Sequence, residues 1–211
     1  MFKGYKKSVL ICTCILMLTA GFSGCSKSSE SFDVSDFIEN GLHQSAETVF
    51  ERYGWKLDAA SQEDNGSGQV TYTAAETIQV GDYQISPELT FQDGECTAFF
   101  YQVDLPQDID TRKAYDFLME QSEMARKQVG PYCDLESEEM AMYATFPDDT
   151  YPTFEDFDAA VQANPTLIGT WIWLLSEVDP SGSLVSSANL FLYEEGNGQP
   201  YYTFYVNEMS R

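Results

Sequence analysis

The sequence predicts an α+β domain in which amphipathic helices pack on an antiparallel β-sheet. In some segments apolar residues recur every three or four positions, as on one face of a helix. In others apolar and polar residues alternate on either side of a tight turn. The two kinds of segment follow one another along the chain, which favours a helical layer over one sheet. With 211 residues, 43% of them hydrophobic, the chain is long enough to bury such a core.

The first helix is expected at residues 33–53. Gly54 is placed to end it, because glycine readily adopts the left-handed conformation that closes a helix. A turn-rich loop at 62–68 follows, and strands are expected near 69–74 and 76–85. The apolar face of the helix would consist of Phe37, Ile38, Leu42, Val49, Phe50 and Tyr53.

A β-hairpin and a second helix are expected next. Asp93-Gly94 is a strong signal for a tight hairpin turn. The helix should start between residues 108 and 111 and run to 129, where Gly130-Pro131 stops it. The alternating apolar residues of the hairpin are Leu89, Phe91, Phe99, Tyr101 and Val103, and the inner stripe of the helix is Tyr115, Leu118, Ser122, Ala125 and Val129.

The last third of the chain is expected to be mostly strands. A short helix should bury Phe154, Phe157 and Val161 and end at Pro165. The expected elements are a strand at 140–146, this helix at 153–163, and strands at 169–178, 184–193 and 201–207, with a turn at 179–182.

The two hairpins are alike in sequence. Leu89, Phe91, Gly94, Phe99, Tyr101 and Val103 correspond to Leu190, Leu192, Gly196, Tyr202, Phe204 and Val206. This predicts a duplicated helix-plus-hairpin unit, the alternative being a chance likeness of aromatic strands. The element order is similar to that of tandem-repeat β-lactamase-inhibitor proteins and cystatin-like domains, a similarity that implies a fold and no function.

The N-terminus has the three parts of an export signal. Lys3, Lys6 and Lys7 precede an apolar run at 9–20, which is shorter than the roughly 20 residues that span a bilayer. The following Phe22-Ser-Gly-Cys25 resembles the bacterial lipobox, although the family usually has an aliphatic residue at the position of Phe22. The alternatives are a plain secretory signal and an uncleaved anchor.

The lipobox resemblance implies a division of the chain into three parts. Residues 1–24 would be a signal peptide, 25–31 a lipidated cysteine with a polar tether, and 32–211 a single acidic domain. Cys25 would carry a diacylglyceryl group, whose two acyl chains, such as palmitate, would hold the protein on the outer face of the cell membrane. The membrane is therefore an expected partner through the lipid alone.

The charge of the chain is strongly negative. The 34 acidic residues face 11 Lys and Arg, and loss of three lysines with the signal peptide would leave eight, a formal charge of −26. Nucleic acid is an unfavourable partner, because no basic patch can neutralise phosphates. A charged partner should be cationic or bridged by metal; the alternative is that the acidity serves solubility only.

Two cysteines remain after the signal and the lipid site, Cys96 and Cys133. In an exported protein they can form a disulfide, the alternative being two buried thiols. A cysteine nucleophile is disfavoured, because the sole histidine, His43, lies far from both in sequence. No zinc spacing, phosphate loop or serine-hydrolase motif is present, so no cofactor and no metal site is expected.

Carboxylate chemistry remains open. Glu138-Glu139, Asp148-Asp149 and Glu155, Asp156 and Asp158 are close pairs in sequence. Two acidic side chains at suitable separation hydrolyse glycosides, but such groups are also ordinary helix-start charges and solvated faces. Asp148 and Asp149 with Asp156 and Asp158 could bind calcium through their oxygen atoms, but the twelve-residue EF-hand pattern is missing.

Aromatic residues give the clearest surface hypothesis. Trp171 and Trp173 share one face of their strand, and Tyr201 and Tyr205 share one face of theirs. These four residues are a candidate surface for a protein or glycan, unless a second layer buries them. The preferred function is a membrane-anchored binding module; the alternatives are a glycan hydrolase and a structural or regulatory subunit of an envelope complex.

Overall fold

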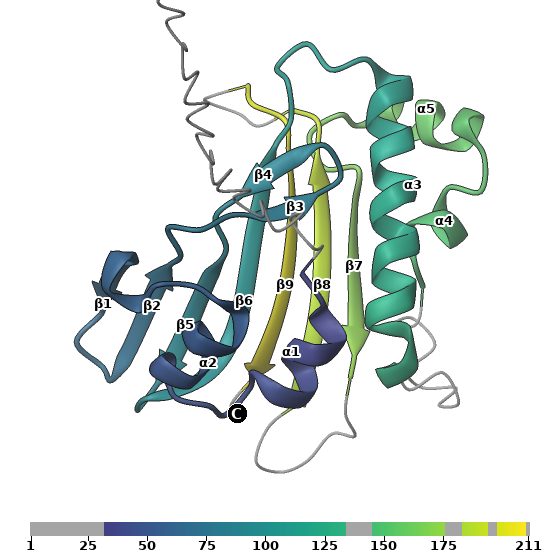
Figure 1. The fold of residues 1–211 in the computed structure, drawn as a ribbon. Helices are drawn as coiled ribbons and strands as arrows, with labels where there is room; N and C mark the ends of the chain where they lie inside the picture. Colours follow the sequence, from purple (N-terminus) through teal and green to yellow (C-terminus); the bar gives the residue numbers. More distant parts are fainter. Residues whose placement is uncertain (1–31, 134–144, 176–182, 194–197, 210–211) are drawn as a thin grey trace, which may run out of the picture.

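A computed structural model describes residues 32–133, 145–175, 183–193 and 198–209. A seven-stranded antiparallel sheet carries on one face a layer of five helices and a small two-stranded hairpin (Figure 1). This arrangement confirms the predicted fold class. No helix of the described segments is long and apolar enough to cross a membrane.

The large sheet has the strand order β1-β2-β5-β6-β9-β8-β7, and every neighbouring pair is antiparallel. The strands are β1 (Ser61–Asp64), β2 (Gln69–Thr73), β5 (Glu88–Gln92), β6 (Glu95–Asp104), β7 (Gly169–Leu174), β8 (Ser183–Phe191) and β9 (Tyr201–Met209). The small hairpin consists of β3 (Ile78–Val80) and β4 (Tyr83–Ile85).

The helices are α1 (Val34–Asn40), α2 (Ala46–Tyr53), α3 (Thr111–Gln128), α4 (Pro147–Thr150) and α5 (Phe154–Ala163). Two short 3₁₀ turns are at Leu57–Ala59 and Gly130–Tyr132. Side-chain caps mark the predicted helix starts: Asp110 accepts from the backbone N–H of Arg112, and Thr153 accepts from that of Asp156. The predicted second helix and the predicted short helix are therefore confirmed.

The two halves of the sheet repeat one pattern. Leu89 lies opposite Phe99 in the first hairpin, and Leu190 lies opposite Tyr202 in the second. The last strands of the halves, β6 and β9, pair at the centre, where Tyr101 faces Phe204. Each half thus contains a helical segment followed by a three-stranded antiparallel unit, β2-β5-β6 in the first half and β7-β8-β9 in the second, and the first half adds the edge strand β1 and the β3–β4 hairpin. The repeated unit agrees with the sequence correspondence of the hairpins. Origin by duplication stays a prediction.

The core lies between the helices and the covered face of the sheet. Phe32, the first described residue, stacks on Phe99 with ring centroids 4.2 Å apart, and Tyr101 stacks on Phe204 at 5.3 Å. The largest side chains that are fully buried include Trp173, Tyr202, Phe37, Phe50, Phe99, Phe146 and Phe157. Burial of these aromatic rings is the main apolar contribution to folding.

The single helix predicted at 33–53 is wrong. The chain breaks after α1, where the backbone N–H groups of Gly41 and Leu42 both donate to the carbonyl of Phe37. His43 takes a positive φ of 60°, and its N–H donates to the carbonyl of Cys96 on β6. Ser45 then caps α2 through the N–H of Thr48. Backbone pairing of His43 and Gln44 with Cys96, at the start of β6, stabilises the break over a continued helix.

Other boundaries also differ from expectation. The predicted strand at 76–85 is the β3–β4 hairpin, which turns at Gly81 with φ 54°. Part of the predicted loop 62–68 belongs to β1, an exposed edge strand whose polar sequence has no apolar alternation. The strand expected at 140–146 and the turn at 179–182 lie wholly or mostly outside the described residues.

Candidate functional site

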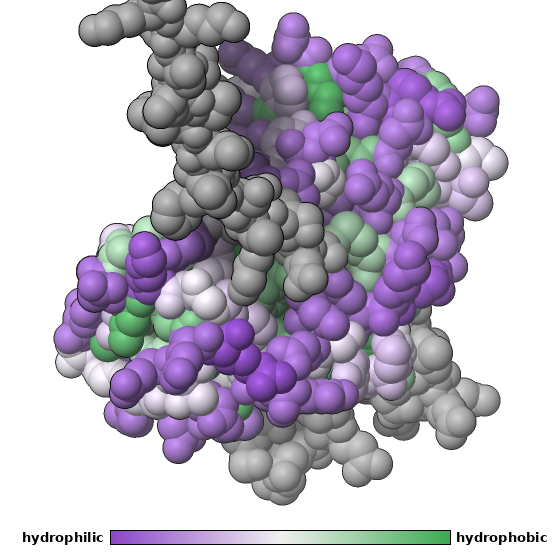
Figure 2. Space-filling model, in the orientation of Figure 1, coloured by the Kyte–Doolittle hydropathy of each residue, from purple (hydrophilic) through white to green (hydrophobic). Residues whose placement is uncertain are grey.

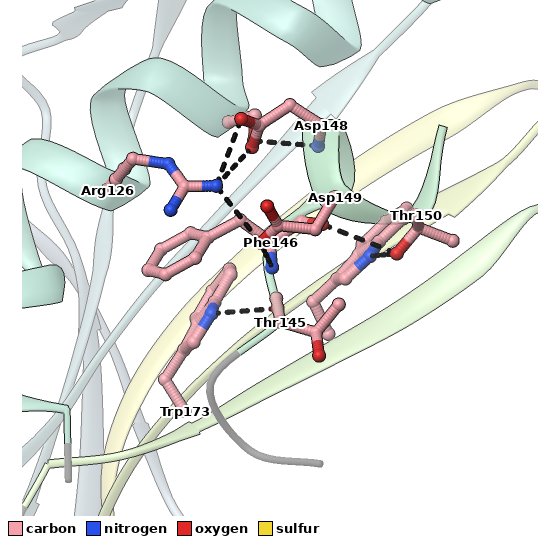
Figure 3. A network of polar contacts seen from close by, with 9 residues as sticks. Arg126, Thr145, Phe146, Asp148, Asp149, Thr150 and Trp173 are labelled. Atoms are coloured by element: carbon pink, nitrogen blue, oxygen red, sulfur yellow. Dashed lines mark hydrogen bonds and ion pairs between the residues drawn. The ribbon is translucent and has the colours of Figure 1, made fainter. Parts of the chain in front are cut away.

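Trp171 and Trp173 lie on the covered face of β7 and are not part of an exposed surface. They are 4% and 0% exposed. The indole N–H of Trp171 donates to Thr150 Oγ1 at 2.9 Å, and that of Trp173 donates to the carbonyl of Thr145 at 3.2 Å (Figure 3). Both tryptophans therefore hold the segment around α4 against the sheet, and their prediction as a partner surface is corrected to a structural role.

An ion-pair network between α3 and α4 also holds this segment in place (Figure 3). The Arg126 guanidinium donates to Asp148 at 2.9 Å and to Asp149 at 3.0 Å, and it lies 4.3 Å from the ring centroid of Phe146. Phe146 in turn stacks on Trp173 at 5.1 Å. The predicted acidic pair Asp148-Asp149 thus joins α4 to α3 and stands as a structural pair.

Tyr201 and Tyr205 lie on the opposite face of the sheet. Both are half-buried, whereas their neighbours Tyr202 and Phe204 point into the core. Since successive residues of a strand point to opposite faces, the pattern of the core assigns every other residue of β5 to β9 to a second face. We call this second face of the sheet the open face, because all the helices in Figure 1 lie on the other side.

The open face carries aromatic and aliphatic side chains in register on neighbouring strands. Phe100 of β6 lies opposite Tyr205 of β9, with ring centroids 6.1 Å apart, and Tyr201 stacks on Phe191 of β8 at 4.6 Å. Ile172 of β7 is 37% exposed. Other positions of the open face carry hydroxyl and amide side chains: Thr71, Thr73, Thr90, Gln102, Thr170, Ser187, Asn189, Thr203 and Asn207.

Within the described strands, carboxylates are the only charged groups on the open face. None of the seven strands contains a lysine, arginine or histidine within its described bounds. Glu88 of β5 lies directly beside Phe100, and Asp104 of β6 lies directly beside Tyr201. Each of the two aromatic pairs therefore has a carboxylate next to it on the same row of the sheet.

The electrostatics of the open face follow from this charge pattern. Partial burial and the nearby Glu63 carboxylate raise the pKa of Glu88. Among the described residues no hydrogen bond or ion pair reaches the Glu88 carboxylate. Partial burial also raises the pKa of Tyr205, so its phenol stays protonated at neutral pH.

The other described residues that the sequence marked as site candidates are buried or interact with neighbouring residues of the chain. Cys96 and Cys133 are buried free thiols, and burial raises their pKa to about 12 and about 11. His43 is exposed, with its Nδ1 3.7 Å from Glu208. Thr153 Oγ1 donates to Asp156 in a helix cap, and Gln162 donates to Asp158. Glu138-Glu139 and Cys25 lie outside the described residues.

A separate cleft lies between the β3–β4 hairpin and the start of α3. Its volume is about 590 Å³. Asp110 in it caps α3, and Asp116 pairs with Arg112 at 3.1 Å. The lining residues are Asp82, Tyr83, Pro106, Asp108, Ile109, Asp110, Lys113, Asp116, Phe117 and Glu120. No group of three or more His, Cys, Asp or Glu side chains in the described segments is placed to hold a metal ion.

The helix-covered side contrasts with the open face. In Figure 2 its surface over α1, α2 and α3 is mostly hydrophilic, with apolar side chains in separate spots. The described lysines and arginines all lie in or beside these helices: Arg52, Lys56, Arg112, Lys113, Arg126 and Lys127. The positive charge of the described lysines and arginines is therefore confined to the helical layer.

Comparison of the chain with known protein families, with curated proteins and with solved structures finds no match.

The sequence hypothesis did not include Phe100, Ile172 and Phe191, apolar residues of the open face, in the candidate surface. The sequence signal that could have identified them is the alternation of the strands, because each directly neighbours a core residue: Tyr101, Trp171 or Leu190. Grouping Trp171 with Tyr205 failed because the faces of two strands can be matched only when their register is known.

Proposed function

We propose that this chain is a lipid-anchored binding module of the outer face of the cell membrane that recognises its partner through the open face. One observation carries the proposal: β6, β9, β8 and β7 present aromatic, aliphatic, hydroxyl and amide side chains on a face against which none of the described helices packs. Rings with polar rims and adaptable hydroxyl and amide groups are typical of recognition surfaces.

The anchor is proposed from the sequence resemblance of residues 22–25 to the lipobox. A tether of six residues, 26–31, separates Cys25 from Phe32, which is already buried against Phe99. Six residues span at most about 20 Å, so the domain would stay close to the membrane surface. The acidic domain is repelled by anionic lipid heads, and attachment would therefore depend on the acyl chains.

The anchor is tested by palmitate labelling and membrane fractionation of the full chain and of Cys25→Ser. We expect the label on the full chain in the membrane fraction, and an unlabelled Cys25→Ser protein that is no longer held there by lipid. A labelled Cys25→Ser protein would contradict the assignment of the lipid site.

Binding is tested with a photo-reactive benzoylphenylalanine in place of Ile172 in the native lipoprotein on its own cells. Ile172 is exposed, apolar and on the open face, so the substitution changes little of the fold. Ala159, exposed on α5, is the matched position in the helical layer. Reproducible adducts from Ile172 and none from Ala159 support the proposal, and adducts from Ala159 alone would overturn the choice of face.

Among the described residues, the cleft lined by Asp82, Asp108 and Glu120 is the candidate site for a hydrolase that uses two carboxylates. Asp110 in this cleft caps α3, and Asp116 forms an ion pair with Arg112, so the other acidic residues would be the catalytic acid and base. We place this function second, since the open face is supported by its register and composition.

A further inference from the structure

The partner of the open face can be described by its chemistry. On one row of the sheet Glu88, Phe100 and Tyr205 are consecutive neighbours, and on another row Asp104, Tyr201 and Phe191 are. Each row places a carboxylate beside two aromatic rings. A lysine or arginine side chain satisfies both components, because its cationic head pairs with a carboxylate while ring faces attract the cation and pack on its stem.

The two rows are a fixed distance apart. Phe100 and Asp104 are four residues apart on β6, and a strand rises about 3.3 Å per residue, so the rows are separated by about 13 Å. Gln102 lies between them and donates to Asp104 at 2.7 Å, which orients that carboxylate on the strand. The face therefore offers two cation positions at a defined spacing.

Charge excludes the simplest alternative occupant, a second copy of this chain. The formal charge of the chain is −23, and the strands that form the open face contain no basic residue within their described bounds. Two open faces brought together would oppose carboxylate to carboxylate, which is unfavourable. The partly buried Glu88 also lacks a cationic neighbour among the described residues, so a partner's cation would supply a missing interaction.

We propose that the open face docks a basic protein segment that presents two lysine or arginine side chains about 13 Å apart, one to the Glu88–Phe100–Tyr205 row and one to the Asp104–Tyr201–Phe191 row. This inference rests on the proposed binding function and adds to it the chemical class of the partner. A glycan, the other class that aromatic surfaces bind, would use the rings without needing the carboxylates.

The experiment measures the yield of adducts from benzoylphenylalanine at position 172 in isolated membranes that carry the native lipoprotein. The test variant is Glu88→Gln/Asp104→Asn, which keeps size and hydrogen bonding and removes two charges. The matched control is Glu47→Gln/Glu51→Gln, which removes two exposed charges from α2. Resistance to limited proteolysis checks that both variants are folded.

We expect the test variant to lose about tenfold or more of the adduct yield, because removing charges that face a partner slows association and weakens the complex. The control should retain it. Raising the salt from about 0.1 M to about 1 M shortens the screening length from about 10 Å to about 3 Å and should lower the yield of the parent protein. The peptide attached at position 172 should contain lysine or arginine.

Unchanged yield in the test variant, or an adduct of a glycan or of a peptide without basic residues, would overturn the basic-segment inference and leave the binding function standing. Absence of any adduct from position 172 in the parent protein would overturn the binding function itself, and the inference with it. Whether the parent protein forms an adduct from position 172 therefore distinguishes the two failures.

Discussion

The two faces of the sheet use the same kinds of residue for different purposes. On the covered face Trp173 stacks on Phe146, and its N–H is bonded to the backbone of Thr145. On the open face Tyr205 contacts Phe100 across the strands, and no described helix covers the pair. The aromatic content of a strand therefore does not reveal a binding surface; the register and the placement of the helices decide which rings are available.

Charge separates the two faces in the same way. Several carboxylates of the helical layer have cationic partners, as in the pairs Asp36–Arg52 and Asp148–Arg126. Those of the open face, such as Glu88, have none among the described residues. Among the described residues, the helical side contains both signs of charge, whereas the strands of the open face contain carboxylates alone and are complementary to positive charge from outside. This difference is what makes the open face the better candidate site.

The largest test of the comparison removes one ring from each face. Trp173→Ala should lower the free energy of unfolding by about 3–5 kcal/mol, because it leaves a large cavity in the core and an unpaired Thr145 carbonyl. Tyr205→Ala should cost only about 1 kcal/mol, the value of an aromatic pair at a partly exposed site. Urea unfolding of both variants measures the difference.

Trp173→Phe is the control for the core position, since it keeps a ring on Phe146 and loses the indole hydrogen bond and only part of the buried ring volume. It should fall between the parent and Trp173→Ala. Equal losses for Trp173→Ala and Tyr205→Ala would break the comparison, because they would mean that the open face is a second packed layer.

A second test concerns the break that shapes the helical layer. A Cβ added at Gly41 would lie 2.8 Å from Cε2 of Phe37 and closer still to Cδ2, so Gly41→Ala forces the buried Phe37 ring to move. The expected loss of unfolding free energy is about 1–3 kcal/mol. Gly130→Ala, where the nearest side-chain atoms are 3.9 Å away, is the control and should stay within about 0.5 kcal/mol. If Gly41→Ala left the free energy of unfolding unchanged, the segment between α1 and α2 would be able to accommodate the added methyl group without strain.

Most of the fold could be predicted from periodicity, and the exceptions share a cause. The stripe of α3 and the Asp93-Gly94 hairpin carry strong local patterns, and the structure has both. The break at Gly41 was missed because the apolar spacing continues through it, and only pairing of His43 and Gln44 with Cys96 reveals it. Tertiary contact overrides a local helical pattern there.

The candidate site could be predicted only in part. Tyr201 and Tyr205 were identified correctly as residues of one face, since alternation within a strand is local information. The partners of that face, Phe100 and Phe191, depend on which strands become neighbours and in which register. Strand order is a non-local property, and no motif in the sequence encodes it.

The smallest expected effects come from a matched pair of substitutions that each replace a carboxylate by an uncharged amide. Their effects on the free energy of unfolding should have opposite signs. Burial opposes ionisation of Asp148, but hydrogen bonds from Ser122 and Arg126 and the charge of Arg126 outweigh it and lower the pKa of Asp148. Burial and Glu63 raise the pKa of Glu88. At pH 7, Asp148→Asn should therefore destabilise and Glu88→Gln should slightly stabilise, each by less than about 1 kcal/mol, because both groups are partly exposed.

The pH dependence separates these effects from changes in packing. A lowered pKa contributes stability above the unfolded value, about 4, and that contribution is lost as the pH falls through the folded pKa. A raised pKa disfavours the folded state at neutral pH, and this cost disappears as the pH falls and Glu88 takes up its proton. Both differences from the parent, measured by urea unfolding between about pH 7 and pH 3, should shrink towards zero in acid. If Glu88→Gln destabilised the protein at pH 7 as Asp148→Asn does, the Glu88 carboxylate would already have a favourable partner within the chain, and the contrast in charge between the two faces would fail.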